Sequence, residues 1–294
     1  AMGCGALDAN TTGASNTALG RNSLTDNTTA SNNTAIGFQS LLANTTGSKN
    51  VAVGAYALDA NTDAANNTAV GYSALSANTT GHSVTAVGRD AMVSNTTGYY
   101  NTAVGRDASK DNTTGLENTS IGYSALSANT TASNNTALGS KALKVNTTGS
   151  ANTAAGAFCL DANTTGAYNS AFGYSALSAN TTANNNNAFG EQSLLANTTG
   201  SENNAFGRYA LTTSTTGNNN IAIGYAALRM LTTSAYNVAI GNYAGDAITT
   251  GQSNTVIGNN AGTALTTPNN NTVLGAAALY TATTGANNVA VGYA

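Results

Sequence analysis

Charged and chemically reactive side chains are scarce in this 294-residue sequence. Asp, Glu, Lys and Arg make up 7% of the residues, whereas about a quarter is usual in a globular protein. One proline, one histidine, two cysteines and no tryptophan are present. A net charge of −3 without any cluster of Lys or Arg argues against a nucleic-acid partner. No apolar run is long enough for a membrane helix, so we expect no membrane insertion by this segment.

A repeat of 17 residues organises the chain. The motif N-T-A-x-G returns from Asn16 to Asn288 at a period of 17 without insertion or deletion. The consensus reads N-T-A-φ-G-x-x-A-L-x-x-N-T-T-G-x-x, where φ is apolar. Such a unit is too short for the helix pairs of helical solenoids, and Asn, Thr and Gly are poor helix formers. It suits one coil of a β-solenoid, with two strands of about five residues and two turns.

We therefore predict an all-β protein with the fold of a parallel β-solenoid, one coil per repeat. Residues 1–294 are expected to form a single uncapped solenoid of about 17 coils. Aliphatic residues recur too regularly for a disordered chain, which also usually carries more charge and proline.

Alternation within N-T-A-φ-G places φ and Thr on one face of the strand and Ala on the other. We expect φ to point inward. The Gly that follows needs a positive φ angle or leaves no room for a Cβ, and N-T-T-G is expected to form the opposite turn with left-handed backbone at Asn and Gly. The predicted core row includes Val53, Val70, Val87, Val104, Ile121 and Leu138, and the turn glycines include Gly54, Gly71, Gly88 and Gly105.

The Ala of N-T-A then points outward and forms a strip of small side chains. We interpret Ala69, Ala86 and Ala103 as an interface row for close packing of another copy. The alternative is that small residues suit a tightly curved strand.

Two further rows have two possible interpretations each. The Asn of N-T-T is replaced by an apolar side chain at Leu231, Ile248 and Leu265, which form either an altered core layer or a contact patch. A Tyr follows the turn Gly in several repeats. This possible contact row either presents amphipathic surface to glycans or proteins, or packs over a turn. Its members are Tyr72, Tyr123, Tyr174 and Tyr225.

Residues for catalysis or metal binding do not gather in the sequence. The single His82 lies in a turn-like stretch, and Asp8, Asp59 and Asp161 occupy one column but lie repeats apart. Neither an EF-hand nor a repeated calcium-loop spacing occurs. We expect no enzyme activity, no cofactor and no metal.

The cysteines and the N-T-T motifs carry little further information. Cys4 and Cys159 are nine coils apart, which is too far for a disulfide within one solenoid. N-T-T also fits the N-glycosylation sequon, so modification depends on the host.

The stretches "NTAVG", "NNTAIG" and "NTALG", each followed by A-L, resemble the head repeats of YadA-like trimeric autotransporter adhesins. They are also similar to repeats in bacterial and phage tail-fibre proteins. This resemblance implies a left-handed parallel β-roll in which three chains pack about one axis. It also implies an extracellular location, on a cell surface or a virion appendage.

The sequence thus predicts a structural or adhesive extracellular fibre segment. Self-association is expected side by side as a trimer, end to end into a filament, or both, because the chain starts and stops in the same column without a cap. A host-surface glycan or protein is a further expected partner. The alternative is a ligand-binding solenoid that binds ice or a glycan. Ice-binding faces usually show T-x-T, whereas the Thr residues of N-T-T are adjacent and are expected to point to opposite faces.

Overall fold

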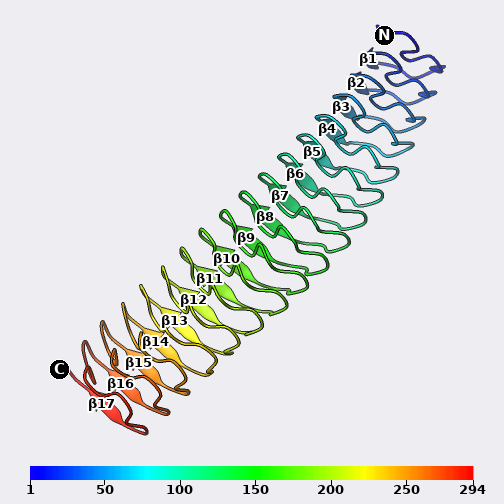
Figure 1. Cartoon of the computed structure of the whole chain (residues 1–294). Helices are drawn as coiled ribbons and strands as arrows, with labels where there is room; N and C mark the ends of the chain where they lie inside the picture. The colour runs from blue at the N-terminus through cyan, green and yellow to red at the C-terminus, as the bar shows by residue number, and fades with distance from the viewer. Residues whose placement is uncertain (294) are drawn as a thin grey trace. The chain divides into compact units, whose positions relative to one another are not determined.

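The computed structural model describes residues 1–293 and confirms a β-solenoid without any helix among them. The chain divides into two compact units, Ala1–Thr148 and Gly149–Ala294. Within each unit, successive coils stack with their strands side by side and parallel, one coil per repeat (Figure 1). The left-handed sense and the single solenoid over 1–294 stay predictions.

From Thr17 on, each coil contributes one strand of three residues, not two strands of five. Strands of neighbouring coils pair with equivalent residues opposite each other, for example Ala69 with Ala86. The first unit contains β1 (Thr17–Leu19), β2 (Thr34–Ile36), β3 (Val51–Val53), β4 (Thr68–Val70), β5 (Thr85–Val87), β6 (Thr102–Val104), β7 (Thr119–Ile121) and β8 (Thr136–Leu138). The second contains β9 (Thr153–Ala155), β10 (Ser170–Phe172), β11 (Asn187–Phe189), β12 (Asn204–Phe206), β13 (Ile221–Ile223), β14 (Val238–Ile240), β15 (Thr255–Ile257), β16 (Thr272–Leu274) and β17 (Val289–Val291).

The A-L segment forms turns instead of the expected second strand, because its backbone alternates in handedness. Ser73 and Leu75 have φ angles of 52° and 54°. These turns still bond from coil to coil, as the Leu75 N–H donates to the Ala91 carbonyl at 3.0 Å. The backbone groups therefore find partners without a regular strand.

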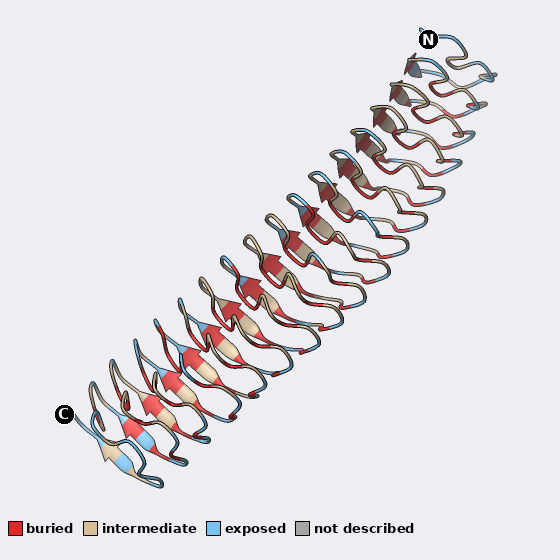
Figure 2. Ribbon diagram, in the orientation of Figure 1, coloured by how far each residue is buried: buried red, intermediate tan, exposed pale blue. Residues whose placement is uncertain are grey.

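The predicted core row and interface row are inverted in the structure. The alternation is correct, but the middle residue of each strand, usually Ala, is the most buried of the three and its two neighbours are more exposed (Figure 2). Ala69, Ala86 and Ala103 are all 0% exposed. Val53, Val70, Val87 and Val104 are only half-buried, and Ile121 and Leu138 are 43% and 38% exposed.

The inversion follows from what fills the interior opposite the strand. Leu75 and Ala74, from the A-L segment, are completely buried, as are the two Asn side chains of the same coil, Asn67 and Asn78. A coil of 17 residues encloses a narrow cross-section, and a large side chain on one wall fits a small one on the other. The Leu row is therefore the main apolar core, and the strand supplies Ala.

Two rows of buried asparagines run alongside the Leu core. In the N-T-T row, the Asn78 amide donates to Asn61 Oδ1 at 3.1 Å and to the Gly81 carbonyl at 2.9 Å. In the N-T-A row, Asn67 also donates to the Gly81 carbonyl, at 2.9 Å, and its Oδ1 accepts from the Val84 N–H. Burying an amide is costly unless it is hydrogen-bonded. The ladders satisfy this requirement through the coil before and the coil after, except at Asn197, whose Oδ1 has no partner where Ser214 replaces the next Asn of the row.

The predicted turn glycines are confirmed for both of the expected reasons. Gly71 has a φ of 140°, and a Cβ built on it would lie 2.4 Å from the Gly88 carbonyl oxygen of the next coil. The left-handed backbone expected at Asn and Gly of N-T-T-G is wrong, because neither Asn78 nor Gly81 has a positive φ angle. A Cβ there would instead meet Asn78 Oδ1 at 2.4 Å, so close packing of the Asn ladder favours the small residue.

The departures from the consensus inside the core compensate one another. Leu231, Ile248 and Leu265 are 0% exposed, which confirms the altered core layer. Two of them share a coil with a Gly in the Leu column. A Cβ on Gly245 would lie 3.0 Å from Ile248 Cδ1, and one on Gly262 would lie 2.9 Å from Leu265 Cδ1. In these two coils the large apolar side chain comes from the Asn position of N-T-T instead of the Leu position of A-L.

A second compensation joins neighbouring coils. Ser109 replaces the Leu and Ser120 replaces the Ala of the strand, and both are buried. Their hydroxyls are 2.8 Å apart and hydrogen-bonded. The two buried hydroxyls thus pair with each other, and the Ser120 hydroxyl also lies 3.4 Å from the Thr102 carbonyl oxygen.

We predict strong coupling between Gly245 and Ile248. Gly245→Leu alone overfills the coil and is expected to destabilise it by about 1–3 kcal/mol, while Ile248→Ala leaves a cavity that costs about 2–5 kcal/mol. The double variant should be more stable than the sum of the two effects by at least about 1 kcal/mol. Unfolding midpoints in denaturant, followed by circular dichroism, measure this coupling. Gly245→Leu combined with the remote Leu177→Ala is the control and should be additive.

Candidate interaction surface

The outward side chains of the strands form a regular surface along each unit. We call the first and third residues of every strand the strand face. In β4 these are Thr68 and Val70, on either side of the buried Ala69. Because the strands pair in register, the same two positions recur from coil to coil in straight rows about 4.8 Å apart.

The strand face carries no charge. The chain has 9 basic and 12 acidic residues, 21 in all, and none of them is the first or third residue of a strand. Thr and aliphatic residues dominate, and several large side chains are well exposed, including Leu19 at 44% and Leu274 at 45%. The apolar φ residues of N-T-A-φ-G, which the sequence predicted in the core, therefore lie on the surface.

Charged groups border the strand face on the turn that follows it. Arg89 pairs with Asp90 at 3.2 Å, and Arg208 pairs with Glu191 of the preceding coil at 3.2 Å. The Arg side chains of both pairs are about half-exposed, at 54% and 51%. Exposed pairs of this kind contribute little to stability, but they form a hydrophilic margin beside an uncharged face.

The possible contact row of tyrosines is exposed but not continuous. Exposure ranges from 54% at Tyr72 to 37% at Tyr225. Each ring packs on a neighbour of its own: Tyr72 on Tyr56 at 5.8 Å, Tyr123 under the Arg106 guanidinium at 5.5 Å, Tyr174 on Phe158 at 5.9 Å, and Tyr225 on Tyr209 at 5.9 Å. The structure therefore does not join them into one platform.

The remaining candidate residues do not converge. Among the described residues, no three His, Cys, Asp or Glu side chains lie close enough to hold a metal. His82 stacks on Tyr99 with ring centroids 4.9 Å apart. Burial raises the pKa of Asp59, one of whose buried carboxylate oxygens has no hydrogen-bond partner.

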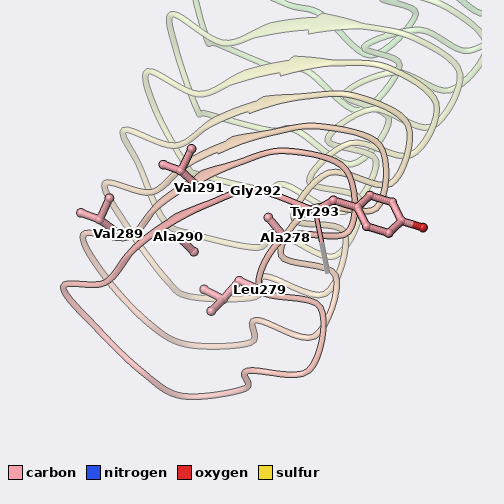
Figure 3. A pocket seen from close by; sticks show the side chains of 7 residues that line it. All are labelled: Ala278, Leu279, Val289, Ala290, Val291, Gly292 and Tyr293. Carbon is pink, nitrogen blue, oxygen red and sulfur yellow. The ribbon is translucent and has the colours of Figure 1, made fainter.

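Hollows in the second unit include one at β17 and one over the turns. One, of about 350 Å³, is lined by Ala278, Leu279 and residues 289–293 (Figure 3). Ala278, Leu279 and residues 289–291 belong to the columns of the interior and the strand, whereas Tyr293 follows the turn Gly and is exposed. The other, of about 290 Å³, lies over the turns and is lined by Gln192, Tyr209, Thr212, Thr213, Arg229 and Met230. Both threonine hydroxyls there donate to backbone carbonyls.

The sequon asparagines point inward. Asn78, Asn95 and their equivalents are fully buried, and their side-chain amides donate hydrogen bonds within the ladder. The folded coil therefore does not present these Asn side chains for glycosylation.

Compared with protein-family models, curated proteins and solved structures, the chain gives no match. The described residues include no helix long and apolar enough to cross a membrane.

We predict very different reactivity for the two cysteines. Cys4 is exposed, whereas Cys159 is fully buried and its Sγ contacts the Ala171 carbonyl at 3.1 Å. Burial raises the pKa of Cys159 to about 12. The thiolate is the reactive form, so at pH 8 only on the order of one Cys159 in 10⁴ is ionised, and the fraction rises only as the pH approaches 12.

Labelling with a chromogenic disulfide at pH 8 should modify one thiol rapidly and the second only after denaturation. The Cys4→Ser variant, as the control, should show no rapid phase. Rapid modification of Cys159 in the folded variant would mean that its coil opens readily.

Proposed function

We propose that the chain is a structural β-solenoid whose strand face packs side by side against copies of itself, as part of an extracellular fibre. The observation that carries this proposal is the uncharged, partly apolar strand face. Exposed apolar surface that recurs over many coils is typical of interaction sites.

The repeat supports a second copy as the occupant. A surface with a fixed period is matched along its length only by a partner with the same period. Another copy of the chain has this period by construction, and symmetric self-association is common among soluble proteins. Each strand covers roughly 50 Å² of face, so about sixteen coils are needed for the 800 Å² per partner of a typical stable interface. Association should therefore strengthen as more strands of a unit take part.

The resemblance to adhesin-head and tail-fibre repeats supports the setting on a cell surface or a virion appendage. It also supports three chains around one axis. The glycan or protein that such a fibre contacts is a separate proposal, for which the exposed tyrosines are the candidate residues.

Lysine substitutions in the strand face test the proposal. Val70→Lys, Val87→Lys and Val104→Lys together place three charges on neighbouring strands of the first unit. We expect the full chain to be oligomeric, and the triple variant to associate at least about 100-fold more weakly, because desolvating an unpaired charge at an interface costs several kcal/mol. Sedimentation velocity measures the assembly, and circular dichroism checks that the fold is retained.

Thr80→Lys, Thr97→Lys and Thr114→Lys provide the matched control. These threonines are exposed and lie outside the strands, in the same region of the first unit. This variant should assemble like the unmodified chain. Unchanged assembly of the Val variant would refute the interface. Lysines at Ala69, Ala86 and Ala103 are not a test of association, because these positions are buried and the variant is expected to unfold.

Ice binding is a second candidate, favoured by one feature of the first unit. β4, β5 and β6 all read Thr-Ala-Val, and both outward residues lie on the same side of the strand. The result is a regular array of hydroxyl and methyl groups, formed not by N-T-T but by the strand itself.

Thermal hysteresis of the purified chain tests this candidate. If the array binds ice, Thr85→Lys should abolish most of the hysteresis, while Thr97→Lys should leave it unchanged. No hysteresis in the unmodified chain would remove the candidate.

A further inference from the structure

Three phenylalanines interrupt the aliphatic row of the strand face in the second unit. Phe172, Phe189 and Phe206 are the third residues of β10, β11 and β12, and we call them the phenylalanine block. Their rings stack in succession, with centroids 4.6 and 4.8 Å apart and interplanar angles of 11° and 8°. Phe172 and Phe206 are 38% and 39% exposed. The block is thus an ordered outward stack, spaced by the coil itself.

The block has a different neighbour on each side. The third residue of β9, which pairs with β10, is Ala155, so the surface drops from a phenyl ring to a methyl group within one coil. On the other side the row continues with Ile223, Ile240 and Ile257. This row therefore has a step at Ala155–Phe172 and a smaller one at Phe206–Ile223.

The first strand residues next to the block are small and polar. Ser170, Asn187 and Asn204 take the positions that Ile221 and Val238 occupy in the following coils. The Asn187 amide donates to Asn204 Oδ1 at 2.8 Å. The rings therefore lie beside a row of smaller, polar side chains, two of which are joined by a hydrogen bond.

A periodic interface has a difficulty with register. Where the facing rows consist of Ile and Val, a shift of one coil exchanges similar contacts for similar contacts, so several registers have nearly the same free energy. Such a surface slips unless something distinguishes its positions. A shift of one coil moves the step at Ala155 by about 4.8 Å relative to the partner, so rings meet side chains of a different size and leave a gap or an overlap.

We propose that the phenylalanine block sets the axial register between laterally associated copies of the chain. The inference rests on the proposed self-association, to which it adds a device that selects one alignment. The partner is a second copy, because only a copy carries the same step at the same place in the same period.

Intermolecular distances between spin labels test the register. Cys4→Ser removes the exposed thiol, and Asn259→Cys introduces a label at an exposed turn position beside the strand face; the buried Cys159 can stay. In this background the full chain should give one narrow intermolecular distance distribution. Phe172→Ile, Phe189→Ile and Phe206→Ile together should leave the assembly mass unchanged, but broaden the distribution into several distances that reflect shifts of about 4.8 Å.

Ile223→Val, Ile240→Val and Ile257→Val together form the matched control, with three substitutions in the same row and the block intact. This control should keep the single distribution. A single distribution in the Phe variant would refute the role in register. Dissociation of the Phe variant would refute it too, because the block would then be an affinity patch. If the unmodified chain sediments as a monomer without intermolecular distances, the proposed self-association itself is wrong.

Discussion

Register between coils is the constraint on which the structure depends. Each coil donates and accepts backbone hydrogen bonds with residues at or next to the equivalent positions of the coils before and after it, so one residue must suit both neighbours at once. The turn glycine shows how little freedom remains, because the space that a Cβ on Gly71 would need is occupied by the carbonyl of Gly88. An inserted residue would displace every row of a unit, and the sequence keeps its period of 17 from Asn16 to Asn288.

The same stacking explains why the chain tolerates an unusual backbone. Leu75 has a positive φ angle, a conformation that costs about 1–2 kcal/mol for a residue with a side chain. The side chain is fully buried in return, which stabilises by about 1.5–3 kcal/mol, and the Leu75 N–H bonds to the next coil. Neighbouring coils thus hold the left-handed residue in place on both sides.

The repeat and the stacking of the coils could be predicted from the sequence, but the side chains that form the core could not. The period, the parallel stacking and the turn glycine follow from columns without exceptions. The prediction of which strand side chains face the core was wrong. Hydrophobicity ranks Val70 above Ala69, but the space left beside Leu75 and the buried asparagines decides which side chain fits inside. Left-handed backbone at Ser73 and Leu75 was not predicted either, since neither residue type favours it. The pairing of Gly245 with Ile248 was visible in the sequence only as two separate departures.

The absence of charge from the strand face has no explanation inside the coil. A Lys in place of Thr85 would point outward and would disturb neither the Leu core nor the Asn ladders. The turns show that the fold accepts charge at outward positions, as with Arg89 and Asp90. Edge protection is no reason either, because each of these strands inside a unit is paired on both sides. The proposed self-association would account for the uncharged residues at Thr85 and Val87, because a second copy packed on this face would have to desolvate any charge placed there.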